Sequence, residues 1–520
     1  MRHRRPDHLA GLAAIIAAVG VVALIAGAFV LGQVTRSTTA ESTRLTTASV
    51  APRQPVTFAS SRIRNVVLVV ADDLDWKLWD EIPRLKALRA RGTTLTNYVV
   101  SDSLCCPSRT TIFRGQYVHN HQVVSNEVTS GGGWPTFRDK GYPTDCLPTW
   151  LSAVGVHTGL VGKYLNEYPQ TPVEAVTAPP GWNEFVVPTT PFGAYHGYDY
   201  TLAANGALQQ YGNAPKDFLN DVLDDYASRF IANASTPFFL ELASFTPHLP
   251  SPVAERHKGS HAGAQAPRDA AFNVAITNPP SWLANAGPLS KAAINAIDRT
   301  WVNRAESAES FADSVETVLD SLVATGHESD TLVIVTSDNG FHMGSYRTRR
   351  GKRTAFDADT VVPFVAIGPG VVPGKRIEDM ASETDLGPTV AALLGATAPE
   401  WVDGRSIVGL LDSTTLGYGS IPPTRTAALS ESLGVTSPGD PDYELLAPPN
   451  FTAMHTRDWL YVESLTGEQE LYNRRTDPLE LVNVIETAPP ETVLALKRQF
   501  EALRTCAGST CRVADSMQVP

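Results

Sequence analysis

NVVLVVADD, residues 65–73, is the stretch that decides the fold class of this chain. Residues 66–70 are all apolar and mostly β-branched, as is typical of a strand buried on both faces. The strand pattern then stops at Asp72 and Asp73. A strand covered on both faces belongs to a sheet with helices on each side, so this stretch predicts an α/β fold.

The same pattern recurs twice further along the chain. Residues 238–243 (FFLELA) predict a strand that is followed by His248, and residues 332–336 (LVIVT) predict another that leads into Asp338 and Asn339. An apolar helical face precedes the second of these strands and ends near Gly326. Sites in α/β sheets lie outside the carboxyl ends of the strands. We therefore expect polar residues that are far apart in sequence to meet at one sheet edge.

The N-terminus carries a targeting signal. Basic residues at positions 2, 4 and 5 precede a stretch from Leu9 to Leu31 without any charged residue, and about 20 apolar residues suffice to span a bilayer. The basic flank is expected to stay cytoplasmic. We expect residues 1–35 to form a signal anchor or a signal peptide, and the absence of a clear cleavage site favours the anchor. The predicted location is exported: membrane-anchored with an extracytoplasmic catalytic domain, or secreted after cleavage.

Four regions organise the chain. Residues 36–61 are rich in Thr, Ser and Ala and predict a flexible linker after the N-terminal segment. Residues 62–412 are expected to form the catalytic domain, with a long surface insertion at 250–300. A smaller C-terminal subdomain is expected at 413–520, with short strands at 451–455, 459–463 and 471–472 and an amphipathic helix at 492–503.

The five cysteines of an exported chain can form disulfides. Cys506 and Cys511 enclose a short, turn-prone loop, so we expect them to be bridged. Pairing of Cys106 with Cys146 stays open, and it would leave Cys105 as the odd thiol.

Charge excludes one class of partner. The 520 residues have a formal net charge of −12, and no long Lys/Arg run follows the first five residues, so a nucleic-acid partner is not expected. An acidic protein still binds anions where a few cations converge, and the charge balance therefore excludes little about the substrate.

The predicted strand ends carry the ligands of a hard metal ion. Asp72, Asp73, Asp338 and Asn339 offer three carboxylates and one amide oxygen. Such oxygens suit Ca²⁺ or Mg²⁺ rather than a metal that prefers thiolates. The sequence predicts a divalent cation at this edge of the sheet.

Residues 105–109, CCPSR, resemble the sulfatase signature C-x-P-S-R. The resemblance implies that Cys105 is converted to formylglycine by a separate maturation enzyme. It further implies that residue 105 lies beside a bound Ca²⁺ as a ligand, that Arg109 orients it, and that its hydrate attacks the sulfur of a sulfate ester. The family's fold is an alkaline-phosphatase-like α/β sandwich around a mostly parallel sheet, with a small C-terminal α+β subdomain.

The same resemblance implies which cationic side chains bind the sulfate group. Lys163 in GKYLNEY (162–168), Lys352 in GKR (351–353) and His248 occupy motifs whose residues contact the sulfate or assist the leaving group. Several further residues remain open: three arginines compete with Lys352, and three histidines are further pocket candidates for which structural hydrogen bonding is an equal alternative. These residues are Arg349, Arg350, Arg353, His119, His121 and His342.

The GKYLNEY motif narrows the resemblance. Many arylsulfatases carry His where this chain has Leu165, and GKYLNEY, PPGW (179–182) and the HNH stretch (119–121) are instead similar to the branch acting on 6-sulfated N-acetylglucosamine, that of glucosamine-6-sulfatase and the heparan endosulfatases. A sulfated carbohydrate or an aryl sulfate is the implied substrate. Two alternatives stay open: a phosphonate or phosphate diester hydrolase of the alkaline phosphatase superfamily, and an inactive sulfated-glycan binding protein.

Overall fold

The computed structural model describes residues 63–412, 425–438, 440, 442–443 and 446–518. The expected N-terminal signal segment and linker lie outside the described residues. Among the described residues, no helix is both long and apolar enough to cross a membrane.

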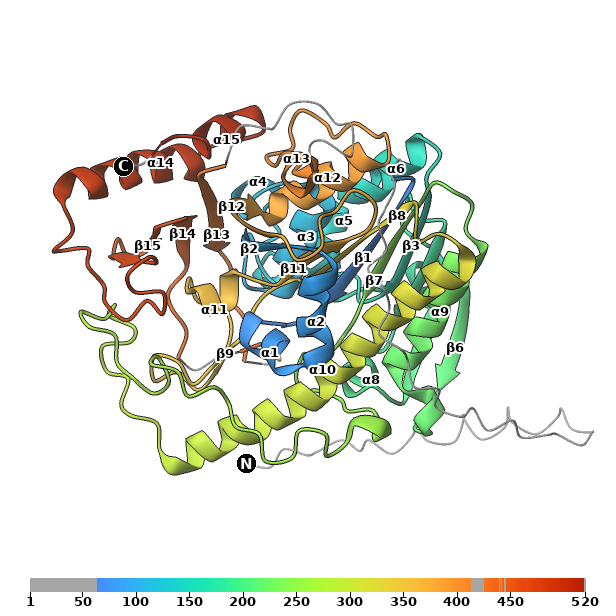
Figure 1. Cartoon of the computed structure of the whole chain (residues 1–520), viewed down its shortest axis with the longest axis horizontal. Coiled ribbons are helices and arrows are strands. Elements are labelled where there is room, and N and C mark those ends of the chain that lie inside the picture. Colours follow the sequence, from blue (N-terminus) through green and yellow to red (C-terminus); the bar gives the residue numbers. More distant parts are fainter. Residues whose placement is uncertain (1–62, 413–424, 439, 441, 444–445, 519–520) are drawn as a thin grey trace, which may run out of the picture. The chain divides into compact units, whose positions relative to one another are not determined.

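A ten-stranded sheet forms the centre of the described part (Figure 1). In spatial order its strands are β12 (Arg376–Ser382), β2 (Thr93–Val99), β11 (Phe364–Ile367), β8 (Thr331–Ser337), β1 (Asn65–Ala71), β7 (Phe238–Ala243), β3 (His157–Gly162), β4 (Glu184–Pro188), β5 (Tyr200–Ala204) and β6 (Ala207–Tyr211). The central run β8-β1-β7-β3-β4 is parallel, whereas β11, β5 and β6 pair antiparallel with their neighbours. The three strands expected from the sequence are confirmed.

Helices cover both faces of the sheet. Successive side chains of β1 point to opposite faces, so each face of this strand packs against a different set of helices. Val66, Leu68 and Val70 pack with α3 (Cys105–Arg114), α6 (Leu147–Ala153) and α12 (Leu386–Leu393). Val67 and Val69 pack with α9 (Leu219–Asn233) and α10 (Lys291–Thr325) on the other face. This layered arrangement explains why the strand has no polar residue between positions 66 and 70.

The long helix α10 corrects one expectation. Its apolar face ends where the sequence indicates, with Gly326 as a left-handed C-terminal cap (φ 76°). The insertion expected at 250–300 is nevertheless too long, because α10 begins at Lys291 after the Ser290 cap. The first turns of α10 are largely exposed, and residues 291–300 carry only Ile294 and Ile297 as large apolar side chains, so the apolar pattern that marks a helix in sequence is weak there.

The C-terminal region forms a separate antiparallel sheet. Its order is β13 (Ala427–Ser432), β14 (Phe451–Thr456), β15 (Trp459–Ser464) and β16 (Gln469–Asn473), which confirms the expected short strands. The helix α14 (Pro490–Arg504) follows, and the Cys506–Cys511 disulfide links it to α15 (Ser509–Ala514). Cys105, Cys106 and Cys146 are free buried thiols, so the open pairing of Cys106 with Cys146 does not occur.

The other elements are short. They are α1 (Trp76–Glu81), α2 (Pro83–Arg91), α4 (Val118–His121), α5 (Gly133–Asp139), α7 (Pro172–Val176), α8 (Pro191–His196), α11 (Asp357–Thr360), α13 (Val408–Asp412), β9 (His342–Met343) and β10 (Arg350–Gly351).

Candidate active site

Four parallel strands deliver polar side chains to one edge of the sheet. Asp72 and Asp73 follow β1, Lys163 follows β3, and Asp338 follows β8. His248 lies a few residues beyond the end of β7. The structure thus brings together strand ends that are separated by up to 266 positions in sequence, as the α/β pattern predicts.

Two lysines neutralise the aspartates at the end of β1. Lys163 Nζ lies 2.6 Å from Asp72 Oδ2, and Lys352 Nζ lies 2.6 Å from Asp73 Oδ1. The amide of Asn339 donates a 2.6 Å hydrogen bond to the same Asp73 oxygen. Burial favours the neutral acid, yet Lys163 and the other nearby cations hold the pKa of Asp72 below its ordinary value. The aspartate is therefore ionised in the buried site.

Cys105 is the first residue of α3 and faces this charge cluster. Its thiol donates to Asp72 Oδ1 at 3.4 Å, and Lys352 Nζ donates to its sulfur at 3.0 Å. Burial and the neighbouring Asp72 carboxylate raise the pKa of the Cys105 thiol well above its ordinary value. The unmodified thiol is consequently protonated and a poor nucleophile.

Arg109 lies one helical turn after Cys105 and is fully buried. Its Nε and Nη2 atoms contact Asp338 Oδ2 at 3.0 and 2.9 Å, and its Nη1 donates to the Lys163 carbonyl at 3.2 Å. The guanidinium therefore holds two segments of the site together, the residue after β8 and the residue after β3.

The donor set fits a hard divalent cation. The ligand atoms of Asp72, Asp73, Cys105 and His248 all lie within 4.8 Å of one another. Asp73 Oδ2 and Asn339 Oδ1 are buried oxygens without a hydrogen-bond partner, which is costly unless another group satisfies them. Oxygen donors of this kind match Ca²⁺ or Mg²⁺.

His248 is a charged donor at the same site. Its Nδ1 lies 2.6 Å from the Leu249 carbonyl and its Nε2 lies 3.1 Å from Asp442 Oδ1, so both ring nitrogens face acceptors. Burial opposes the charge, but the carboxylates of Asp73, Asp72 and Asp442 raise the pKa of His248 to about 10. The ring is therefore an imidazolium at neutral pH.

Asp442 is a site residue that the sequence did not reveal. It lies between β13 and β14, and its Oδ1 also contacts Lys352 Nζ at 3.1 Å. Its Oδ2 accepts a 3.0 Å hydrogen bond from Asn126 Nδ2. The surrounding SPGDPDYE (437–444) has the composition of an ordinary polar turn, so nothing local distinguishes this aspartate.

Comparison with known proteins gives the identity of the chain. Residues 64–396 match the family model described as Sulfatase. The chain belongs to the sulfatase family. N-acetylglucosamine-6-sulfatase of Homo sapiens is 30% identical over 487 residues, which cover 87% of each chain. This sulfatase is therefore a sulfuric ester hydrolase.

Solved structures show the fold of the sulfatase. A protein in complex with its substrate D-glucosamine-2-N,6-O-disulfate superposes with a TM-score of 0.67 at 17% identity, covering 85% of this chain and 96% of the other. The phosphonate monoester hydrolase of Agrobacterium radiobacter superposes at 0.64 with 20% identity, covering 85% and 95%. These likenesses confirm the expected alkaline-phosphatase-like fold.

The three additional histidine candidates of the sulfatase form hydrogen bonds or ion pairs with neighbouring elements of the fold. His119 pairs with Glu431 at 2.9 Å, His121 contacts Thr111 Oγ1 at 3.0 Å, and His342 contacts Asp359 at 3.0 Å. His119 thus ties α4 to β13. The ring of His121 lies against α3, and burial lowers its pKa well below the ordinary value.

The three arginines around Lys352 do not share its position in the sulfatase. Arg353 donates to Thr436 Oγ1 and to the Gly434 carbonyl. Arg350 donates to Thr300 and lines the pocket that also includes His248, and Arg349 lines a neighbouring pocket beside α10. Among the four cations of residues 349–353, Lys352 is the one within hydrogen-bond distance of the Cys105 sulfur.

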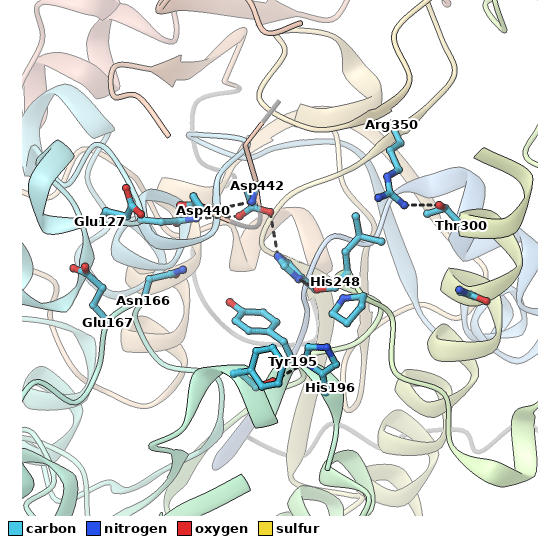
Figure 2. A pocket seen from close by; sticks show the side chains of 15 residues that line it. Glu127, Asn166, Glu167, Tyr195, His196, His248, Thr300, Arg350, Asp440 and Asp442 are labelled. Carbon is cyan, nitrogen blue, oxygen red and sulfur yellow. Dashed lines mark hydrogen bonds and ion pairs between the residues drawn. The ribbon is translucent and has the colours of Figure 1, made fainter. Parts of the chain in front are cut away.

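A pocket of about 790 Å³ opens above His248 and Asp442. Figure 2 shows Tyr195 and His196 below these two residues, with Glu127, Glu167 and Asp440 on one side and Arg350 on the opposite side. The Tyr195 ring packs 4.6 Å from the His248 ring. The pocket has room for a sugar beside the charged cluster.

Proposed function

We propose that this sulfatase hydrolyses the sulfate ester of a sulfated sugar such as 6-sulfated N-acetylglucosamine, with formylglycine at position 105 and one bound Ca²⁺. The observation that carries the proposal is the position of residue 105. It begins α3 where a buried aspartate cluster and the cations Lys163, His248 and Lys352 converge. The human relative named N-acetylglucosamine-6-sulfatase supports the sugar.

Two groups complete the proposed centre. Asp72, Asp73, Asp338, Asn339 and residue 105 would hold Ca²⁺, which supplies positive charge for the sulfuryl oxygens. Formylglycine would supply, as its hydrate, one hydroxyl that attacks sulfur and a second that loses its proton, re-forms the aldehyde and so releases the sulfate. Arg109 assists by fixing Asp338 through its two contacts.

The charged side chains of this chain then have distinct roles. Lys163 and Lys352 bind the sulfate oxygens and offset the negative charge that develops on them in the transition state. His248 is held through Nδ1 by the Leu249 carbonyl, and the proton on its Nε2, which faces Asp442 Oδ1, is the one that would protonate the departing alkoxide. Asp442 keeps His248 and Lys352 in place, since one carboxylate oxygen contacts both.

Relative rates on different substrates separate the sulfatase activity from the alternatives. The phosphonate monoester hydrolase has the same fold, so a phosphonate or phosphate diester hydrolase is the second candidate. Comparing turnover of an aryl sulfate with that of an aryl phosphodiester discriminates the two. An inactive glycan-binding protein would hydrolyse neither. The full set of buried cations and acids favours turnover.

The decisive test is the chemistry of residue 105. Mass spectrometry of the peptide from the native host should show a mass about 18 Da below the cysteine form. Cys105→Ser should abolish steady turnover of sulfate esters while the melting temperature and circular dichroism stay unchanged, because serine lacks the release route. Sustained multiple turnover by the serine variant would refute the mechanism.

We further propose that the protein is exported. The targeting signal at 1–35 and the Cys506–Cys511 disulfide both fit an oxidising compartment. A linker at 36–61, a catalytic domain at 62–412 and a C-terminal subdomain at 413–520 complete the proposed organisation. The N-terminal segment would provide the membrane contact, and the maturation enzyme for Cys105 is the protein partner.

A further inference from the structure

One wall of the pocket above His248 is acidic. The term acidic wall here denotes Glu127, Glu167 and Asp440, which Figure 2 shows together on one side of the pocket. They come from three separate segments: Glu127 lies before α5, Glu167 lies after β3, and Asp440 lies between β13 and β14. The tertiary structure therefore gathers three carboxylates that the sequence keeps apart.

Each carboxylate of the acidic wall is fixed by a neutral donor. Glu127 Oε1 accepts from Ser437 Oγ at 2.9 Å, Glu167 Oε2 accepts from the Val128 amide at 2.8 Å, and Asp440 Oδ1 accepts from the Asp442 amide at 2.8 Å. Lys352 is the cation that acts on this group, since its charge lowers the pKa of Asp440. The buried atom Glu127 Oε2 has no hydrogen-bond partner.

The three carboxylates act on one another. Burial raises the pKa of Glu167, and the charges of Glu127 and Asp440 raise it further. Burial and the neighbouring Asp442 raise the pKa of Asp440 in the same way. Lys352 offsets part of the charge of Asp440, so the negative potential of the acidic wall rests mainly on Glu127 and Glu167.

Three side chains around residue 105, next to the pocket, carry the opposite charge. Lys163, Lys352 and His248 are cationic and lie around residue 105, where a single sulfate would bind. Arg350 is the cation on the opposite side, and burial lowers its pKa. A second anionic group on the sugar would be repelled wherever it faces the acidic wall. A hydroxyl or an amine in that position would instead donate to the free carboxylate oxygens.

We propose that the acidic wall makes this sulfatase selective for sugars that carry one sulfate, at the reacting oxygen, and no second anionic group facing Glu127, Glu167 and Asp440. The inference rests on the proposed function and adds the charge class of the substrate. Monosulfated amino sugars and their N-acetyl forms belong to that class, and N-sulfated forms do not.

The test compares three sugars that differ at one substituent: glucosamine 6-sulfate, N-acetylglucosamine 6-sulfate and glucosamine 2-N,6-O-disulfate. With the mature full-length enzyme and Ca²⁺, kcat/KM for release of the 6-sulfate should be at least about tenfold lower for the disulfate than for the N-acetyl sugar. Raising the salt concentration should narrow this ratio, because screening weakens the repulsion.

Isosteric variants connect the selectivity to the wall. The double variant Glu127→Gln, Glu167→Gln should narrow the ratio between N-acetyl sugar and disulfate several-fold. Glu255→Gln is the control, since it makes the same Glu→Gln change, removing one negative charge where the double variant removes two, outside the pocket lining. It should leave the ratio as in the wild type. An unchanged ratio in the double variant would overturn the proposal.

A binding measurement separates this inference from the proposed function. Calorimetric titration of full-length Cys105→Ser with the three sugars should show the same order of affinity without any turnover. Tighter binding of the disulfate, abolished by Arg350→Gln, would mean that the second anion is accepted opposite the wall, and the proposal would be wrong. A preserved preference for monosulfated sugars in a protein that hydrolyses none of them would refute only the proposed function.

Discussion

Two buried acids, Asp442 and Glu241, have opposite surroundings. Asp442 is buried, yet Lys352 and His248 hold its pKa well below the ordinary value. Glu241 lies in the middle of β7, and neither of its carboxylate oxygens has a hydrogen-bond partner. Burial raises the pKa of Glu241 to about 7, although the charge of Arg109 opposes this. The first acid is stabilised by partners, whereas the second is a cost to the fold.

Glu241→Gln should therefore change stability in a pH-dependent way. Folding raises the pKa of Glu241 from its ordinary value of 4.5, which applies in the unfolded chain, to about 7. The wild type therefore loses stability as the pH rises through this range. We expect the variant to gain about 1–3 kcal/mol relative to wild type at pH 8 compared with pH 4.5. Urea denaturation at both pH values measures the difference. Equal effects at the two pH values would contradict the assignment.

At the scale of elements, the approach of β3 to β7 depends on Gly162. Its φ is 117°, and a Cβ there would lie 1.9 Å from the Ala243 carbonyl oxygen. Gly162→Ala should cost about 1–3 kcal/mol of stability and should also lower turnover, because the next residue is Lys163. Gly287→Ala is the control, since its Cβ would meet nothing within 4 Å. Thermal unfolding and kcat/KM are measured for both variants. The same stability and the same kcat/KM in Gly162→Ala and Gly287→Ala would show that β3 can shift away from β7 without cost.

The contact between α4 and β13 predicts a second pH dependence. Burial opposes the charge of His119, but Glu431 raises its pKa to about 9 from 6.5. The stabilisation of the fold by the charged His119–Glu431 pair is complete below pH 6.5 and is lost as the pH rises through 9. The stability difference between wild type and His119→Gln should therefore shrink from pH 6 to pH 9.5.

Denaturation curves at these two pH values test the pair, and Glu431→Gln should reproduce the behaviour. A stability difference that stays constant with pH would mean that His119 is neutral in the fold. The pair then would not tie α4 to β13 through charge.

At the scale of the whole molecule, a buried ion cluster joins distant parts of the chain. Arg425, just before β13, contacts Asp385 at 2.5 Å and Asp515 at 2.8 Å. Arg425→Ala would leave two buried carboxylates without their main cation, so it should lower the free energy of unfolding by about 3–5 kcal/mol. Chemical denaturation measures this loss.

Arg457→Ala is the matched control for that experiment. Its pair with Glu378 is largely exposed, at 68% and 59% of the side-chain surfaces, and solvent screens such pairs. It should leave stability unchanged. A loss in Arg425→Ala no larger than in Arg457→Ala would show that the C-terminal sheet does not depend on the ion cluster.

Local pattern alone determined three strands of the central sheet (β1, β7 and β8), the aspartates and asparagine that follow β1 and β8, and the CCPSR motif, because each of these is a run of adjacent residues. Lys163 was identified only through the family resemblance, and the structure places it beside Asp72 at the end of β3. The early start of α10 was missed, since its first ten residues are largely exposed and carry only two large apolar side chains. Only the tertiary structure brought Asp442 to His248 and assembled the acidic wall, because these residues lie on irregular segments whose paths are set by packing between regions far apart in sequence.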